Sequence, residues 1–206
     1  MKETIWLLIF LGVLIWSAIA PKDGITWILE AFPALVALLL ILLTHKRFPL
    51  TPLAYILILF HACILFVGAH YTYAEVPLFN DIQSWLGTAR NDYDKLGHLT
   101  QGFVPAIIAR EILIRFEVFN RPAWQNFFIV CFVLAVSASY ELLEWATALV
   151  SNEAAEAFLG TQGYEWDTQS DMFWALVGSI AGLTILSRLH QKQLDELLNK
   201  SNPNSN

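Results

Sequence analysis

The sequence has 206 residues, of which 56% are hydrophobic, with a mean hydropathy of +0.52 and a formal net charge of −6. Soluble domains average about 45–50% apolar residues, so this composition predicts a membrane protein. No nucleotide-binding loop, nucleophile elbow or Rossmann glycine pattern is present, which argues against ATP-driven and serine-hydrolase mechanisms. Cys63 and Cys131 lie inside apolar runs, where we expect buried thiols rather than zinc ligands.

Six segments have the composition of transmembrane helices, each of which needs roughly 20 apolar residues. They are residues 5–20, 25–43, 52–73, 94–116, 125–150 and 171–189. The predicted fold class is all-α, a polytopic membrane helical bundle with one domain over residues 1–190. A polar cytoplasmic tail follows at 191–206, and we expect residues 199–206 to be disordered.

The first segment has a second interpretation. Ala18-Ile-Ala20 is typical of the small-residue site at which a signal peptide is cleaved. A signal anchor that remains as the first span explains the following segments better, so we keep residues 5–20 in the bundle. The fourth segment, 94–116, is weakly hydrophobic, and we expect it inside the bundle because such a helix is poorly suited to face lipid on all sides.

Two short helices are predicted on the outer surface. Within residues 75–92, Phe79, Ile82 and Leu86 recur at helical spacing, which indicates a helix lying on the membrane surface. Residues 151–160 begin with polar residues and end in glycine, which favours a short capped helix.

The charges predict how the bundle is oriented. With six spans and the N-terminus in the cytoplasm, nine Lys and Arg residues lie inside and three outside. This bias favours N-in and C-in, because positively charged loops stay in the cytoplasm. Thirteen of the eighteen acidic residues then fall on the outer side. The positive-inside rule does not require this excess, so it needs a separate explanation.

Polar side chains on three spans supply that explanation. In the fourth span Asp94, His98, Gln101 and Pro105 are spaced i, i+4, i+7 and i+11, which puts them on one face of a helix. The same reasoning groups two further sets, Ser137, Glu141 and Glu144 on the fifth span, and Asp167, Asp171, Gly178 and Gly182 on the sixth. The two glycines form a GxxxG pattern, which lets another helix approach closely. The predicted topology brings all three faces to the outer side.

Five carboxylates gathered in a low dielectric cannot all stay ionised without partners, and three outcomes are open. A divalent cation can neutralise them, since Asp and Glu oxygens with a histidine suit Mg, Mn, Zn or Fe. Arg90 and Lys95 can pair with some of them. Alternatively, some are protonated and take part in proton transfer. A purely structural interpretation also exists, in which Asp94, Asp167 and Asp171 stabilise helix starts and His98 is an interhelical hydrogen-bonding residue.

The functional interpretation assigns roles to these residues. The predicted metal or headgroup ligands are Asp94, His98, Glu144 and Asp171. Glu141 is the predicted proton acceptor, with His98 as a second catalytic residue. The predicted substrate contacts are His70, Lys95, Gln101 and Asp167. The expected cofactor is a divalent metal ion, and the expected partners are membrane lipids and a lipid-linked substrate, with no nucleic acid.

Four stretches of the sequence resemble the YjdF-type inner-membrane proteins, a bacterial family of unknown function. They are residues 68–77, 90–98, 139–145 and 160–171. The resemblance covers nearly the whole chain and implies the bacterial inner membrane as its location. It implies no activity.

The chain is more distantly similar to VanZ-like membrane proteins. These carry Asp-Lys-x-x-His, a later membrane Glu, and an Asp-rich entry to a glycine-containing last helix. Asp94-Lys95…His98, Glu141 or Glu144, and Asp167…Asp171…Gly178 follow that order. The VanZ pattern has Glu-x-x-Gln where this chain has Glu141-Leu-Leu-Glu144. It has Arg and Asn near the last acids where this chain has Trp166 and Trp174.

Three functions remain open at this point. The leading hypothesis is a site at the outer face that binds or modifies a lipid or cell-envelope intermediate. The second is a small proton-coupled transporter in which Glu141 and Glu144 titrate, although the sequence contains no inverted repeat. The third is a membrane assembly or interaction protein without small-molecule chemistry.

Overall fold

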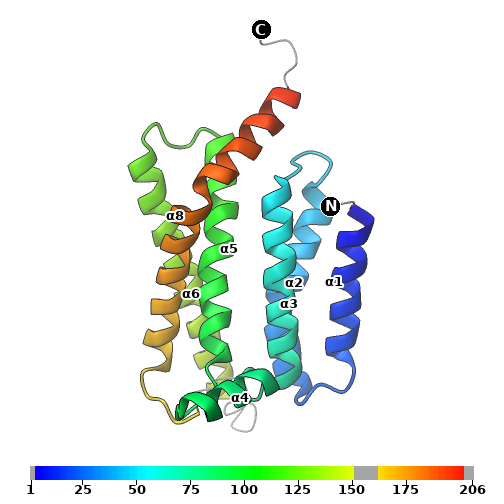
Figure 1. Ribbon diagram of the computed structural model, residues 1–206, viewed down its shortest axis with the longest axis vertical. Helices are drawn as coiled ribbons and strands as arrows, with labels where there is room; N and C mark the ends of the chain where they lie inside the picture. The colour runs from blue at the N-terminus through cyan, green and yellow to red at the C-terminus, as the bar shows by residue number, and fades with distance from the viewer. Residues whose placement is uncertain (1–2, 151–161, 202–206) are drawn as a thin grey trace.

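The computed structural model describes residues 3–150 and 162–201, and over these ranges it contains seven helices and no strand. They are α1 (Glu3–Ala18), α2 (Gly24–Thr44), α3 (Pro52–Tyr71), α4 (Pro77–Leu86), α5 (Tyr93–Arg115), α6 (Pro122–Val150) and α8 (Asp167–Ser201). All except α4 run along the long axis of the molecule (Figure 1). The start of α1 and the end of α8 lie at one end, and α4 lies across the other (Figure 1). The all-helical fold is therefore as predicted.

Four helices, α2, α3, α6 and α8, are long and apolar enough to cross a membrane. Helix α1 is apolar but has 16 residues, which extend about 24 Å at 1.5 Å per residue, against roughly 30 Å of hydrocarbon. Helix α5 has 23 residues and is long enough, but it is not apolar enough to belong to this group. Length and composition thus support four spans, and the prediction of six remains a prediction.

Helix α5 lies at the centre of the bundle. It packs against α3 on one side and against α6 and α8 on the other, so it joins the two groups of helices seen in Figure 1. Its buried residues include Gly97, His98, Val104, Ile107 and Glu111. Because its polar side chains are enclosed by other helices, they are shielded from lipid. The expectation that this weakly hydrophobic helix lies inside the bundle is confirmed.

Glycines bring α5 and α8 into close contact. A Cβ atom at Gly102 would lie 2.0 Å from the carbonyl oxygen of Ala175, and one at Gly178 would lie 2.0 Å from that of Leu99. At Gly182 the corresponding distance to the Phe103 carbonyl oxygen is 2.9 Å. No side chain fits in these gaps, so the backbones meet directly. The close approach predicted from Gly178 and Gly182 is confirmed.

Two helix starts follow from local capping. The Asp23 side chain accepts a hydrogen bond from the Thr26 backbone N–H at 2.7 Å, which caps α2 and lowers the pKa of Asp23. Thr51 caps α3 through the Ala54 backbone N–H at 3.3 Å, and Pro52 follows at the first helical position. Proline suits that position because its missing N–H would have no partner within the helix.

The last helix corrects the predicted tail. The sequence predicted a span ending at residue 189 and a separate polar tail from 191, but α8 runs without interruption from Asp167 to Ser201. The extension is stabilised by packing, since Leu194 is fully buried and the Leu53 backbone N–H donates to Gln193 at 2.8 Å. Disorder was therefore wrong for residues 199–201, and residues 202–206 lie outside the described range.

The two predicted surface helices have different outcomes. Helix α4 (Pro77–Leu86) confirms that the first segment is helical, and its Trp85 is 85% exposed, while its place on the membrane surface remains a prediction. The second, predicted at 151–160, lies outside the described residues. The prediction of two buried thiols also needs correction, because Cys131 is exposed on α6 and Cys63 is only partly buried. An apolar run in a membrane helix includes a face that turns towards lipid.

A closed polar network ties α3, α5 and α8 together at the end opposite α4. The Glu111 carboxylate accepts hydrogen bonds from the Thr51 N–H at 2.9 Å and the Thr51 hydroxyl at 2.7 Å, and it pairs with His190 Nε2 at 3.0 Å. Arg110 donates to His190 Nδ1 at 2.9 Å. Glu111 and His190 are fully buried, and these contacts satisfy them, which is the pattern of a structural network.

Candidate functional site

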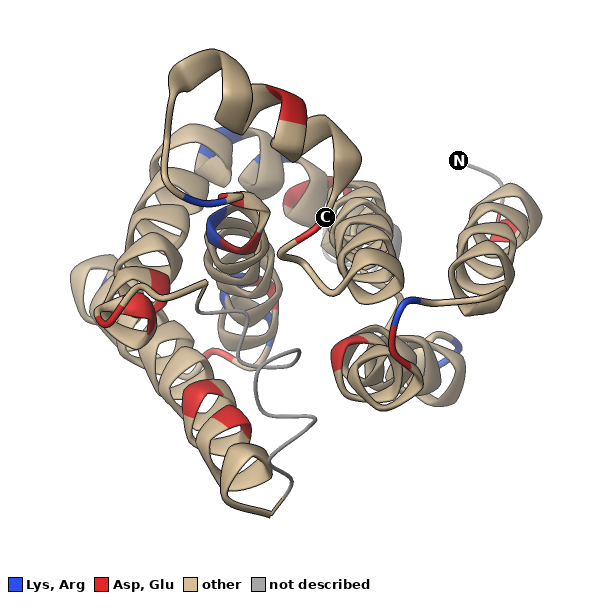
Figure 2. Ribbon diagram, turned by 90° about the horizontal axis from the view of Figure 1, so that it is seen from below, with Lys and Arg blue, Asp and Glu red and all other residues tan. Residues whose placement is uncertain are grey.

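The acidic cluster lies at the end of the bundle where α4 crosses. Viewed from that end, acidic residues occur on several of the helices around the centre (Figure 2). The first turns of α5 and α8 and the last third of α6 meet here, because α5 and α8 start at this end and α6 finishes at it. The three polar faces predicted from the sequence therefore converge.

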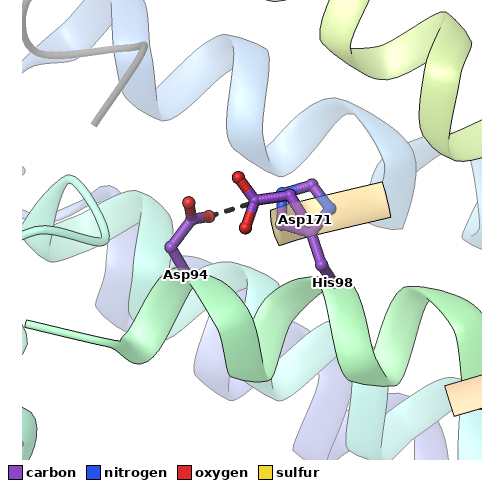
Figure 3. A group of neighbouring side chains, drawn as sticks. All are labelled: Asp94, His98 and Asp171. Carbon is purple, nitrogen blue, oxygen red and sulfur yellow. Dashed lines mark ion pairs between the residues drawn. The ribbon is translucent and has the colours of Figure 1, made fainter. Parts of the chain in front are cut away.

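Asp94, His98 and Asp171 form the first group of possible metal ligands. Each offers one ligand atom, and these atoms all lie within 4.8 Å of one another. Their side chains come from α5 and α8 and point towards one another, and Asp94 forms an ion pair with His98 (Figure 3). His98 is 6% exposed and Asp171 is 2% exposed. Carboxylate oxygens together with an imidazole nitrogen are ligands that suit several divalent metal ions.

His98, Glu141 and Glu144 form a second group, also with ligand atoms within 4.8 Å of one another. Both glutamates are buried, as is Ser137 on the same face of α6, so the predicted face is confirmed. His98 belongs to both groups. It lies 3.7 Å from Glu141 and 3.5 Å from Asp94, measured from Nε2 to a carboxylate oxygen.

The other ring nitrogen of His98 has a fixed partner. His98 Nδ1 lies 2.8 Å from Gln101 Oε1, and an amide oxygen can only accept, so Nδ1 carries the hydrogen. In the neutral ring Nε2 then presents a lone pair towards Asp94 and Glu141. A lone pair that faces two carboxylates is repelled by them unless a proton or a metal ion lies between. The arrangement therefore suits a proton shared between the ring and a carboxylate, or a metal ion beside Nε2.

Arg90 supplies positive charge at the mouth of the cluster. It forms a buried ion pair with Asp167 and lies 3.7 Å from Asp94. Burial lowers the pKa of Arg90, but the hydrogen bond and charge of Asp167 raise it by more, so its pKa stays above the ordinary value. Lys95 instead pairs with Asp92 at 2.7 Å. One of the three expected outcomes, pairing with basic residues, thus applies to Asp167 and Asp94.

On α6 and α8, two carboxylate oxygens remain without a hydrogen-bond partner among the described residues. They are Oε1 of Glu141 and Oδ1 of Asp171, and both are buried. An ionised oxygen in that position is unfavourable by at least the desolvation of one polar group, about 1–3 kcal/mol. Glu141 Oε1 lies 3.7 Å from His98 Nε2, and Asp171 belongs to the other ligand group that includes His98. A cation in either ligand group, or a proton on the carboxylate itself, would remove this cost.

A cavity of about 240 Å³ extends from the cluster into the bundle. Its polar lining lies at the α4 end and its apolar lining lies deeper. The polar lining residues are Glu30, Tyr73, Asp94, His98, Gln101, Tyr140 and Glu144, with His61 further in. The apolar ones include Ala34, Ala37, Ile58, Ala62, Leu65, Val104, Ile108 and Val136. Asp94, His98, Gln101 and Pro105 all line it, which confirms their predicted common face.

Sequence reasoning missed three members of this site. Glu30 on α2 is 6% exposed and accepts a hydrogen bond from the Tyr140 hydroxyl at 2.9 Å, and both residues line the cavity. An acidic residue within an otherwise apolar segment was the available signal for Glu30. His61, expected to be structural, also lines the cavity, and its Nε2 is buried without a hydrogen-bond partner in the described structure.

The predicted substrate contacts are placed differently from one another. Gln101 lines the cavity and orients His98. Asp167 pairs with Arg90, and Lys95 lies beside Asp92. His70 lies against α1, where Nδ1 is 3.0 Å from the Ser17 carbonyl oxygen and the ring packs on Trp16. It is not among the cavity-lining residues.

Comparisons with known proteins identify relatives. A family model described as "Predicted membrane protein (DUF2238)" matches residues 3–192. The inner membrane protein YjdF of Escherichia coli (strain K12) is 50% identical over 182 residues, which cover 88% of this chain and 87% of that protein. No solved structure matches. The resemblance to YjdF-type proteins is thereby confirmed, and the one to VanZ-like proteins remains a prediction.

Proposed function

This chain belongs to the DUF2238 family of predicted membrane proteins and is located in the bacterial inner membrane, and on that premise we propose that it binds a divalent metal ion at its acidic end. Through this ion it holds the headgroup of a lipid or lipid-linked cell-envelope intermediate. The metal ligands are Asp94, His98 and Asp171, with Glu144 beside them. In this proposal six helices cross the membrane, N-in and C-in, and the site opens to the outer leaflet.

One observation carries the proposal. His98 turns Nε2 towards carboxylates on two helices, Asp94 on α5 and Glu141 on α6, while Gln101 fixes Nδ1, which is how a metal-binding histidine is oriented. The buried oxygens of Glu141 and Asp171 that lack a hydrogen-bond partner support a cation beside His98. A metal ion also explains how an acidic pocket accepts a phosphate, because it bridges carboxylates and phosphate oxygens.

The proposal gives Glu141 a separate role. Its Oε1 lies 3.7 Å from His98 Nε2, close to the proposed ion but on a different helix from Asp94 and Asp171. A carboxylate in this position accepts the proton of a water or hydroxyl group bound to the metal. Arg90, held by Asp167 at the mouth, attracts the anionic headgroup. Lys95 adds positive charge nearby.

The experiment compares metal and lipid content in the protein released from mild detergent. Wild type, Asp171→Asn and the exposed control Asp81→Asn are each equilibrated with Mg²⁺, Mn²⁺ or Zn²⁺ and measured by native mass spectrometry. We expect one ion per wild-type chain, its loss in Asp171→Asn and its retention in Asp81→Asn. Folded wild-type protein without metal, or equal metal in Asp171→Asn, would contradict the proposal and favour an assembly role.

A second candidate function rests on His61. This residue lies in the middle of α3 and lines the cavity below the acidic cluster, so ionisable groups continue from the outer end towards the membrane centre. That arrangement suits a proton-coupled carrier. In proteoliposomes such a carrier gives a pH-dependent flux that Glu141→Gln abolishes. Metal binding without any flux removes this candidate.

A further inference from the structure

The cavity changes from polar to apolar along its length. On α5 its lining runs from Asp94 to Ile108, which spans about 21 Å at 1.5 Å per residue. The acidic groups stand at the start of this path, and Val104 and Ile108 stand at its deep end. On α2 it runs likewise from Glu30 to Ala37. The lining therefore has the polarity of an amphiphile that enters headgroup outward.

The cavity wall has few helix–helix contacts on the side between α2 and α6. Helix α3 packs against α5 along one side, whereas α2 packs on α3 and α6 packs on α5 and α8. In the described part of the chain, α2 and α6 have no extensive contact with each other. The Tyr140 hydroxyl, which donates to Glu30 at 2.9 Å, bridges these two helices. Since both are apolar enough to lie in a bilayer, the space between them faces lipid.

We propose that this cavity holds one acyl chain of a membrane phospholipid, which enters sideways between α2 and α6. This inference rests on the proposed function, because the phosphate of the same lipid is the group bound at the acidic end. The Tyr140–Glu30 hydrogen bond lies across the entry and separates to admit the chain. The ligand is thus a membrane phospholipid rather than a soluble phosphate compound.

Size and chemistry favour a single chain over water or a whole lipid. The volume of about 240 Å³ equals roughly eight water molecules at about 30 Å³ each, but each water needs two to four polar partners. In the deep lining only His61 offers a polar side chain, and Ile58, Ala62, Val104 and Val136 offer none. Sites for complete drug-sized ligands hold about 300–1,000 Å³, so this one is suited to part of a lipid.

The test uses a phospholipid with a photoreactive group near the end of one acyl chain. The full-length protein is placed in phosphatidylethanolamine and phosphatidylglycerol vesicles that contain this probe, irradiated and mapped by peptide mass spectrometry. We expect label on α3 and α5 at the deep end of the cavity. Val136→Phe fills part of the cavity, so that about two methylene groups of the acyl chain can no longer be buried there. This loss weakens binding of the chain, and we expect the label to fall about tenfold. Ala135→Phe, on the exposed face of α6, leaves it unchanged.

A second pair of variants repeats the test from another helix, in case Val136→Phe does not fold. Ile108→Phe fills the cavity from α5, and Ile112→Phe, one turn away at a position 39% exposed, is its control. Label confined to the outer, lipid-facing side chains, or equal label in the filled and control variants, overturns the proposal. If a photoreactive prenyl phosphate labels the cavity and the acyl probe does not, the bound chain is not the acyl chain of a phospholipid, and the proposal is wrong.

Metal content measured in the same samples separates the two proposals. The cavity substitutions lie away from the metal ligands, so wild type and all variants should bind equal metal. Metal without cavity labelling means that the acyl-chain proposal fails alone. Cavity labelling without metal means that the chain site stands and the metal site fails.

Discussion

At the scale of single residues, the two ring nitrogens of His98 have different surroundings. One of them is hydrogen-bonded to Gln101, and the other faces carboxylates. Gln101 determines which nitrogen carries the hydrogen, and the fold determines which acids the other nitrogen meets. The two functions are separable because Gln101 contacts Nδ1, whereas Asp94 and Glu141 lie near Nε2 on the other side of the ring. A change at Gln101 therefore tests the orientation of His98 without removing a ligand.

We predict that Gln101→Leu weakens metal binding about 10–100-fold, the usual effect of losing a group that orients a ligand. Gln101 is half-buried, and leucine is of similar size, so the helical fold should persist. The measurement is a metal titration of the detergent-solubilised protein followed by calorimetry. Gln83→Leu on α4 is the control and should bind as wild type does. Unchanged affinity in Gln101→Leu would show that His98 is not a ligand.

The sequence predicted those site residues that share a helix face, and it missed those that meet only through packing. Asp94, His98 and Gln101 were found together because their spacing follows the helical period. Glu30 and Tyr140 are 110 residues apart, and no local pattern connects them. The pairing of Glu111 with His190 was missed for the same reason, since 79 residues separate them.

At the scale of helices, the contact between α5 and α8 holds the proposed ligands in register. Asp94 and His98 lie on one of these helices and Asp171 on the other, and the glycines of the contact follow directly along the same faces. A side chain at Gly178 would meet the Leu99 carbonyl oxygen, one residue beyond His98. Packing and ligand geometry are therefore coupled.

We expect Gly178→Ala to separate the helices, lowering the free energy of unfolding by about 1–3 kcal/mol or more and weakening metal binding as well. Gly12→Ala on α1 is the matched control, because nothing lies within 4 Å of its Cβ position. There alanine should be neutral or stabilise by up to about 1 kcal/mol. Thermal unfolding in detergent, followed by circular dichroism, measures both. Equal stability of Gly178→Ala and wild type would be incompatible with this contact.

The helix ends show where sequence patterns stop being informative. The predicted bounds of α2 and α3 were close because capping residues and prolines mark them locally. Helix α8 continues beyond the predicted span although its last turns are polar in sequence, because Leu194 is buried and Gln193 accepts a hydrogen bond from the Leu53 N–H at the start of α3. A distant helix stabilises what composition alone predicts to be a tail.

At the scale of the whole molecule, the arrangement depends on a polar helix surrounded by apolar ones. Composition predicted the membrane and the all-helical class, and both agree with the fold and with the family. Composition is less informative about α5, because a helix enclosed by α3, α6 and α8 need not be apolar itself. Two spans of the predicted six, α1 and α5, are not among the four supported by length and composition, and the course of α5 decides whether its two ends lie on opposite sides of the membrane.

We predict that α5 does cross. Single cysteines are introduced on either side of it, in a background with Cys63 and Cys131 replaced by alanine. Ser84→Cys lies on α4 and Asn120→Cys lies in the loop before α6, and both positions are exposed. A membrane-impermeant maleimide should label Ser84→Cys in intact spheroplasts and Asn120→Cys only after permeabilisation, because the basic residues near Asn120 favour the cytoplasm. Labelling of both from the same side means that α5 does not span the membrane. Reversed labelling means that the acidic site faces the cytoplasm and an outer-leaflet substrate is ruled out.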